Sequence, residues 1–103
     1  LSRGLGDVYK RQTLYGAEAK YLSAQLMYNA GEYAAAEKEI LNFIDQSTPH
    51  AYWLARSFIL LSDVYVAMDK KLDARQYLLS LQQNYHADDD IERMIQERLE
   101  KLK

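Results

Sequence analysis

The stretch YLSAQLMYNAGEYAAAEKEI, residues 21–40, decides the fold because it holds two helical patterns on either side of one glycine. Small and large apolar residues recur three and four positions apart on both sides, which is the spacing of one helix face. Gly31, between the patterns, suits the left-handed position that ends a helix. We therefore expect helices over about residues 14–30 and 32–46, packed as antiparallel neighbours because so little chain separates them.

Three further helical patterns fill the rest of the chain. The next one covers about residues 50–68 and is apolar nearly all round, so we expect the most buried helix there. It follows the only proline, and Ser47 or Thr48 is expected to cap it, with Pro49 in its first turn. No stretch is typical of a strand, so the predicted fold class is all-α. The last two helices are expected over about residues 72–85 and 89–102.

The chain repeats its own pattern at one fixed spacing, which leads from Ala24 to Ser62 and from Ala36 to Ala74. We call this spacing the repeat step. At this spacing a small residue of the first half corresponds to a small residue of the second half. Small side chains at these positions let two helix axes approach closely. The recurrence predicts one domain over residues 13–103. It consists of two helical-hairpin repeats, over about residues 14–46 and 50–85, and a charged capping helix over about residues 89–102.

Both halves of this recurrence carry the motif of a known family. The first half has a small residue, an aromatic, a glycine, an aromatic and an alanine at matching offsets: Ala24, Tyr28, Gly31, Tyr33 and Ala36. The second half matches through Phe58, Leu61, Ser62, Tyr65 and Ala74. With these residues the chain resembles the tetratricopeptide repeat (TPR) family over about residues 17–86. The resemblance implies an α-solenoid of stacked hairpins.

The chain departs from the family pattern at several positions. Asp69 stands where the second turn would have glycine, and the repeat step is longer than the family's usual one. The other departures are Lys20, Ser23 and Leu72. The wording of residues 48–66 resembles TPR proteins of Bacteroidetes-type bacteria, many of which are envelope proteins. That resemblance favours the bacterial periplasm or cell envelope over the cytoplasm.

The opening residues, LSRGLGDVYKRQ, have no pattern that continues into the helices. Residues 1–12 resemble a translated sequencing adapter, and we interpret them as a non-native leader; a frayed native linker is the alternative. Because the chain lacks an initiator Met and ends in a charged capping helix, it is expected to be the C-terminal fragment of a longer array.

The composition argues against several kinds of chemistry. The chain has no cysteine, no glycine-rich phosphate loop and no metal motif, so we predict no enzyme activity and no cofactor. His50 and His86 are expected at the surface, and residues 88–90, DDD, are expected to cap a helix rather than to bind calcium. A net charge of −2 argues against nucleic acid, and no apolar run is long enough to span a membrane.

The resemblance implies a binding surface on the concave wall formed by the first helix of each repeat. Carried over position by position, the family's groove residues are Glu18, Tyr21, Gln25, Tyr28 and Asn29 from the first repeat and Arg56 and Asp63 from the second, with Ile59, Val66 and Ala67 beside them. Tyr21 and Tyr28 have an alternative role, which is to pack between repeats. The family's clamp for acidic chaperone tails is not expected, since Tyr21, Gln25 and Asp63 do not supply its Lys, Asn and Arg.

The predicted function is therefore a non-enzymatic scaffold that binds a peptide or a partner protein on its concave face. Further TPR repeats of the same chain are a second expected partner. The alternative is that these residues form the structural C-terminal end of a larger bacterial envelope protein whose active domain lies upstream.

Overall fold

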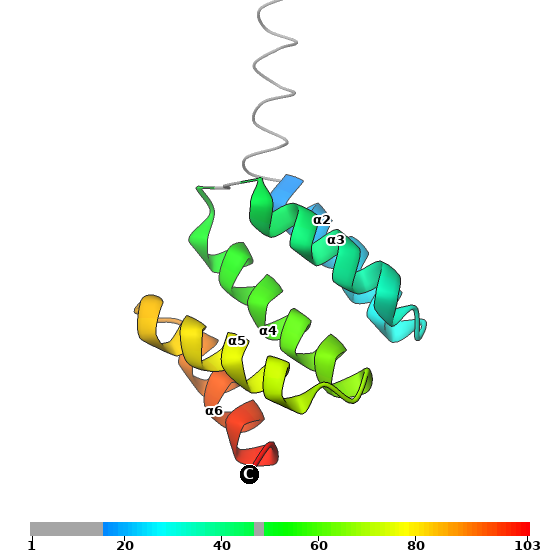
Figure 1. Ribbon diagram of the computed structural model, residues 1–103. Helices are drawn as coiled ribbons and strands as arrows, with labels where there is room; N and C mark the ends of the chain where they lie inside the picture. Colours follow the sequence, from blue (N-terminus) through cyan, green and yellow to red (C-terminus); the bar gives the residue numbers. More distant parts are fainter. Residues whose placement is uncertain (1–15, 47–48) are drawn as a thin grey trace, which may run out of the picture.

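Five α-helices make up the part of the chain that the computed structural model describes, residues 16–46 and 49–103 (Figure 1). No strand occurs within these two ranges, so the predicted all-α class is confirmed. The leader predicted over residues 1–12 and the cap predicted at Ser47 or Thr48 lie outside the described residues. In chain order the helices are α2 (Gly16–Asn29), α3 (Tyr33–Asp45), α4 (Ala51–Ala67), α5 (Lys71–Asn84) and α6 (Ile91–Lys101).

The turn after α2 and the turn after α4 share one geometry and lie one repeat step apart. Gly31 has a φ of 79° in the first turn, and Asp69 has a φ of 61° in the second. Each turn closes with the same two backbone hydrogen bonds, which satisfy carbonyl groups left over at a helix end. In the first turn, Glu32 N–H donates to the Met27 carbonyl (2.9 Å) and Gly31 N–H donates to the Tyr28 carbonyl (3.0 Å). In the second turn, Lys70 N–H donates to the Tyr65 carbonyl (2.7 Å) and Asp69 N–H donates to the Val66 carbonyl (3.1 Å). The aspartate in place of glycine therefore leaves the turn intact.

The start of α4 differs from the sequence prediction. Pro49 lies before the helix, and His50 is its N-cap residue, with φ −88° and ψ 83°. The carbonyl of His50 accepts the first helical hydrogen bond, from Leu54 N–H at 3.1 Å, while Ala51 N–H donates to the Pro49 carbonyl. The chain thus turns at Pro49 and His50 and becomes helical only afterwards, so the placement of Pro49 in the first turn was wrong.

The helices pack as two hairpins, with α4 in the middle of the molecule (Figure 1). α2 contacts α3, and α4 contacts α5, across the two tight turns. α3 and α2 both pack against α4, which joins the hairpins, and α6 covers α4 and α5 at the far end. α4 contributes more buried residues than any other described helix, as its apolar pattern predicted.

The small residues of the recurrence are buried in both hairpins. Ala24 and Ala36 in the first hairpin, and Ser62 and Ala74 in the second, are each at most 1% exposed. The hydroxyl of Ser62 is satisfied because it donates to the Ile59 carbonyl at 2.6 Å. Side chains this small allow the close approach that the recurrence in the sequence predicted.

Candidate functional site

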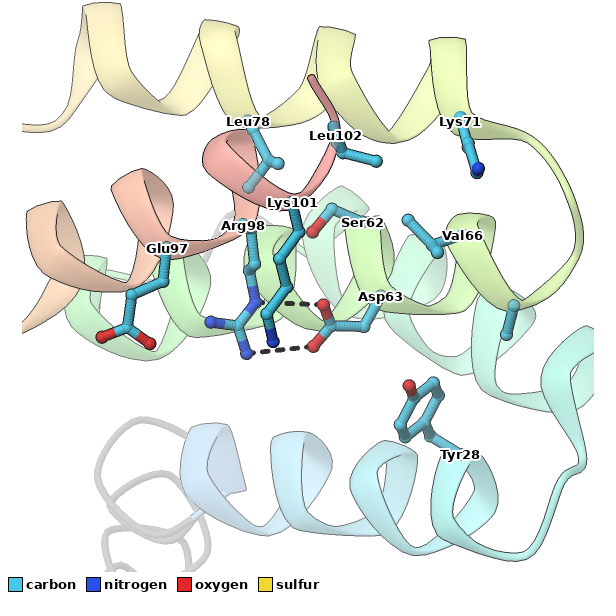
Figure 2. Close-up of a pocket in the computed structure, with 11 residues that line it drawn as sticks. Tyr28, Ser62, Asp63, Val66, Lys71, Leu78, Glu97, Arg98, Lys101 and Leu102 are labelled. Atoms are coloured by element: carbon cyan, nitrogen blue, oxygen red, sulfur yellow. Dashed lines mark hydrogen bonds and ion pairs between the residues drawn. The ribbon is translucent and has the colours of Figure 1, made fainter.

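A groove of about 550 Å³ opens between the end of α2, the second half of α4, the start of α5 and the end of α6 (Figure 2). We call it the central groove. Its wall combines charged, aromatic and apolar side chains, a composition typical of sites that orient a ligand through a few polar groups. The lining residues are Tyr28, Ser62, Asp63, Val66, Ala67, Lys71, Leu78, Glu97, Arg98, Lys101 and Leu102.

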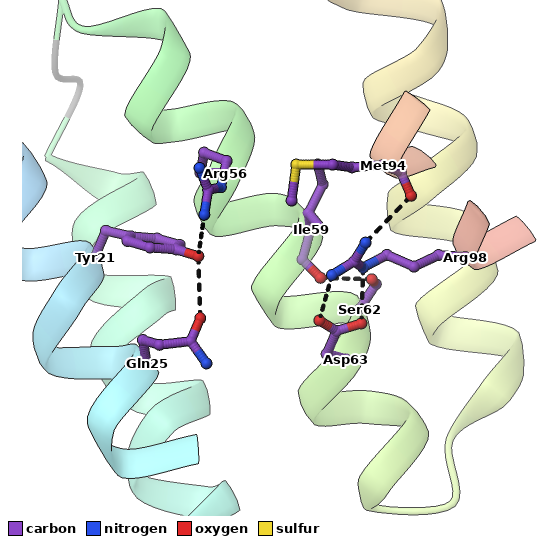
Figure 3. A network of polar contacts seen from close by, with 8 residues as sticks. All are labelled: Tyr21, Gln25, Arg56, Ile59, Ser62, Asp63, Met94 and Arg98. Carbon is purple, nitrogen blue, oxygen red and sulfur yellow. Dashed lines mark hydrogen bonds and ion pairs between the residues drawn. The ribbon is translucent and has the colours of Figure 1, made fainter. Parts of the chain in front are cut away.

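An ion pair between α4 and α6 forms one side of the central groove. The Arg98 guanidinium donates two parallel hydrogen bonds to the Asp63 carboxylate, from Nε to Oδ1 at 3.0 Å and from Nη2 to Oδ2 at 3.1 Å (Figures 2 and 3). Both side chains are about one quarter exposed. A two-pronged pair with this burial is stronger and more rigid than a surface pair. It fixes α6 against α4 and leaves little of the Asp63 carboxylate for a ligand.

Tyr28 faces this ion pair from α2, on the other side of the groove (Figure 2). Its ring packs on Tyr33 with centroids 5.6 Å apart, and the side chain is half-buried. Its hydroxyl has no hydrogen-bond partner within residues 16–46 and 49–103. Burial, with the nearby Asp63 carboxylate, raises the pKa of Tyr28. The hydroxyl therefore keeps its proton at neutral pH and can donate a hydrogen bond into the groove.

A second polar cluster joins the two hairpins away from the groove, and we call it the hydroxyl network. The Tyr21 hydroxyl accepts a hydrogen bond from Arg56 Nη2 at 3.0 Å and donates one to Gln25 Oε1 at 3.0 Å (Figure 3). Gln25 Nε2 donates onward to Asn29 Oδ1 at 3.0 Å. On the other side, Arg56 Nη1 donates to the Tyr52 hydroxyl at 2.9 Å, which donates to Asp90 Oδ1 at 2.9 Å.

Tyr21 lies inside the packed structure. It is 6% exposed, and its ring lies 5.4 Å from that of Trp53. The Arg56 guanidinium lies 4.9 Å above the centre of the Tyr21 ring, in the geometry of a cation–π contact. These contacts match the alternative weighed from the sequence, in which Tyr21 packs between hairpins. Tyr28 differs from Tyr21, because part of its side chain lines the central groove.

The seven residues predicted for the concave wall thus separate into three groups. Tyr28 and Asp63 line the central groove. Tyr21, Gln25, Asn29 and Arg56 form the hydroxyl network. Glu18 is exposed on α2 and joins neither group. Of the residues expected beside them, Val66 and Ala67 line the groove, whereas Ile59 is 1% exposed and packs in the core, so its place on the wall was wrong.

The contribution of α6 to the groove was not predicted from the sequence. Arg98, Lys101 and Leu102 line it, whereas the sequence predicted only a charged capping helix over these residues. A weak signal was present, because Arg98 follows the buried Ile95 by three positions and precedes Leu102 by four. It therefore falls on the edge of the apolar stripe rather than on the opposite face.

The acidic run at residues 88–90 anchors a loop as well as a helix start. Asp89 Oδ1 accepts a hydrogen bond from Ile91 N–H at 3.0 Å, at the first residue of α6, whereas the N-cap residue Asp90 makes no side-chain capping bond. Its Oδ2 accepts one from the Tyr85 hydroxyl at 2.5 Å. Burial, followed by this hydrogen bond, raises the pKa of Tyr85 to about 12. Asp90 accepts from Tyr52, so the loop is tied to α4 and α5.

The two histidines lie in different surroundings. His86 is exposed, as predicted, and its Nε2 lies 3.1 Å from the Gln83 carbonyl. His50 is half-buried at the start of α4 and therefore less exposed than His86. Within the described ranges, no group of three or more His, Asp or Glu side chains comes close enough to hold a metal ion.

The helices of the described ranges are all too short or too polar to cross a membrane. Comparison with known proteins finds no matching family model, no matching curated protein and no matching solved structure.

Proposed function

We propose that this chain is a non-enzymatic scaffold that binds an extended peptide or a segment of a partner protein in the central groove. The observation that carries the proposal is the groove itself, about 550 Å³ in volume and lined by residues of four helices. Tyr28 offers a ring edge and a hydroxyl without a partner in the described chain, beside apolar atoms of Val66 and Leu102. The hydroxyl can form a hydrogen bond with the backbone of a bound peptide, and the apolar atoms can pack against its side chains.

We further propose that the two hairpins are repeats of the tetratricopeptide class. Two observations support this assignment. The helix-ending turns at Gly31 and Asp69, one repeat step apart, share their dihedral sign and their hydrogen bonds. The small residues at the same step are all buried. In such an array the first helices of successive repeats line one wall, which here corresponds to α2 and α4, with α6 in the next place.

A second candidate function is supported by the outer side of α2. Leu22 and Leu26 are 49% and 69% exposed, whereas Leu60 and Val64, which lie one repeat step after them, are at most 2% exposed. Leu60 and Val64 are buried in the core cluster to which α3 contributes. The exposed pair is thus suited to a preceding helix that would pack on α2 as α3 packs on α4. On this proposal the chain is the structural end of a larger array, such as an envelope protein with its active domain upstream.

Selection from a random-peptide phage library tests the scaffold proposal. The library is panned on the immobilised chain, and the enriched peptides are then synthesised and assayed by fluorescence anisotropy. We expect them to bind the wild-type chain and to lose at least about tenfold in affinity when Tyr28→Ala removes the groove's aromatic wall. Leu72→Ala is the matched control, because Leu72 is 80% exposed on α5 and does not line the groove.

Tyr21→Phe separates the groove from the hydroxyl network. It removes one buried hydroxyl and leaves the ring on Trp53, so peptide affinity should stay within about twofold of wild type. Peptides that bind the Tyr28→Ala variant as tightly as the wild type would contradict the proposed site.

A further inference from the structure

The central groove carries positive charge that the described chain does not neutralise. Among its lining residues, Asp63 is bound by Arg98, and Glu97 is bound by Arg93 at 2.7 Å from outside the groove. Lys71 and Lys101 also line it, and neither forms an ion pair or a hydrogen bond with any residue of the described ranges. The groove is therefore cationic in a chain whose net charge is −2.

The two lysines are placed to act on one ligand. Lys71 reaches the groove from the start of α5 and Lys101 from the last turn of α6, so they lie apart along it (Figure 2). Val66 and Leu102 provide apolar surface in the same wall. Tyr28 lies on the opposite side with its hydroxyl available as a donor. All of these groups suit a ligand that alternates acidic and apolar character.

We propose that the ligand of the central groove is an acidic peptide segment, with Lys71 and Lys101 binding two of its side-chain carboxylates. Tyr28 donates a hydrogen bond to the same segment, and an apolar residue between the carboxylates packs on Val66 and Leu102. This inference rests on the proposed peptide-binding function and names its ligand class. It differs from a clamp for a chain-terminal carboxylate, because the charges it recognises are side chains.

A nucleic acid fits this groove less well than an acidic peptide. Its backbone carries a negative charge at every nucleotide, and affinity depends on several neighbouring cations. The groove offers two separated lysines, and the carboxylates of Asp63 and Glu97 lie in the same wall. A peptide can place its carboxylates at the lysines and neutral residues at those acids.

Fluorescence anisotropy with two labelled, capped hexapeptides tests the inference. One has the sequence EELVEE, and the other, QQLVQQ, has the same shape without charge. We expect the acidic peptide to bind about tenfold more tightly at low ionic strength, because each exposed ion pair contributes up to about fivefold. Added salt should reduce this difference. Amide resonances of residues 62–67 and 97–102 should shift with the acidic peptide.

Two double variants distinguish direct contacts of the peptide with the two lysines from long-range electrostatic attraction by the net charge of the chain. Lys71→Gln with Lys101→Gln removes both lysines and should weaken EELVEE about tenfold while leaving QQLVQQ unchanged. Lys38→Gln with Arg75→Gln changes the net charge equally, but these residues are exposed on α3 and α5 and do not line the groove. That control should change EELVEE affinity by less than about twofold, since distant surface charges are screened.

Each other outcome overturns the inference in a recognisable way. Equal losses in the two double variants would mean that long-range attraction, rather than the groove, selects acidic peptides. Equal binding of EELVEE and QQLVQQ, both lost in Tyr28→Ala, would end the acidic preference and leave the peptide-binding proposal standing. If neither hexapeptide binds while phage-selected neutral peptides do, the ligand class is wrong although the scaffold function remains. If the library also yields no groove-dependent peptide, both proposals fail.

Discussion

Asp69 holds a backbone conformation that most side chains avoid. Its φ of 61° lies in the left-handed region, where a Cβ crowds the following carbonyl oxygen. Aspartate tolerates this region better than most residues, and the turn's hydrogen bonds from Asp69 and Lys70 hold the chain there. Gly31 adopts the corresponding conformation without a Cβ. The two hairpins therefore have the same turn, with strain at only one of them.

Reciprocal substitutions at these turns should change stability in opposite directions. Asp69→Gly removes the crowded Cβ and should raise the free energy of unfolding by about 0.5 kcal/mol, after the added chain entropy of glycine is subtracted. Gly31→Ala should lower it by about 1 kcal/mol. A Cβ at Gly31 would meet no atom within 4 Å, so this loss reflects backbone strain alone. Urea unfolding monitored by circular dichroism measures both changes, and a stabilised Gly31→Ala would refute the turn assignment.

Leu22 and Leu26 of α2 are exposed although they belong to its apolar pattern. At the scale of helices, the periodicity of apolar residues was otherwise sufficient to predict the elements and most of the buried residues. Local spacing determines these features, because a helix buries whichever stripe is apolar. The contact between Asp63 and Arg98 could not be predicted in this way. It joins side chains 35 positions apart, and its formation depends on how α6 rotates against α4. The same holds for Arg56, which joins Tyr21 of α2 to Tyr52 of its own helix, while Tyr52 donates in turn to Asp90 in the loop before α6.

The first residue of α4 could not be predicted from the sequence for a different reason. Proline is common both in a first turn and just before a helix, so residue type alone did not distinguish the two positions of Pro49. The half-buried Tyr28 and the fully packed Tyr21 posed a similar problem. Both fall on the inner face of α2, and only the arrangement of neighbouring helices decides that one lines a groove.

The junction of α2 and α3 provides a test of packing at the same scale. Ala36 is 0% exposed, while its neighbour Ala35 is exposed on the same helix. Ala36→Leu should wedge the hairpin open and lower the free energy of unfolding by about 1–3 kcal/mol. Ala35→Leu adds the same atoms with a similar helix propensity and should change it by less than about 0.5 kcal/mol. Thermal melts of both variants make the comparison, and equal melting temperatures would contradict the close crossing at Ala36.

Across the whole molecule, the two ends of the helical stack differ. At one end α6 covers α5 and α4 with buried Ile91 and Ile95, and it turns a charged face outward. At the other end α2 presents Leu22 and Leu26 with about half or more of their surface exposed. This difference is what the proposed repeat array predicts, since in such an array each repeat buries its hydrophobic face on a neighbour.

A tandem chain tests whether the open end accepts another hairpin. A second copy of residues 13–50, inserted before residue 13, would place a copy of α3 ahead of α2 at the native repeat step. If that copy packs on α2 as α3 packs on α4, Leu22 and Leu26 become buried. Leu22→Gln with Leu26→Gln in the original copy should then destabilise the tandem chain by about 3 kcal/mol or more, since a buried leucine contributes about 1.5–3 kcal/mol.

The same double substitution in the parent chain is the control. There Leu22 and Leu26 are largely exposed, so it should cost about 1 kcal/mol or less. Urea unfolding of the four proteins gives the two differences, and amide hydrogen exchange of α2 shows whether the added hairpin protects it. A larger loss in the tandem chain follows only if a helix covers that face in the repeat register. Equal losses, with α2 exchanging at the same rate in both chains, would mean that the repeat step of the sequence does not extend to the packing of a further hairpin.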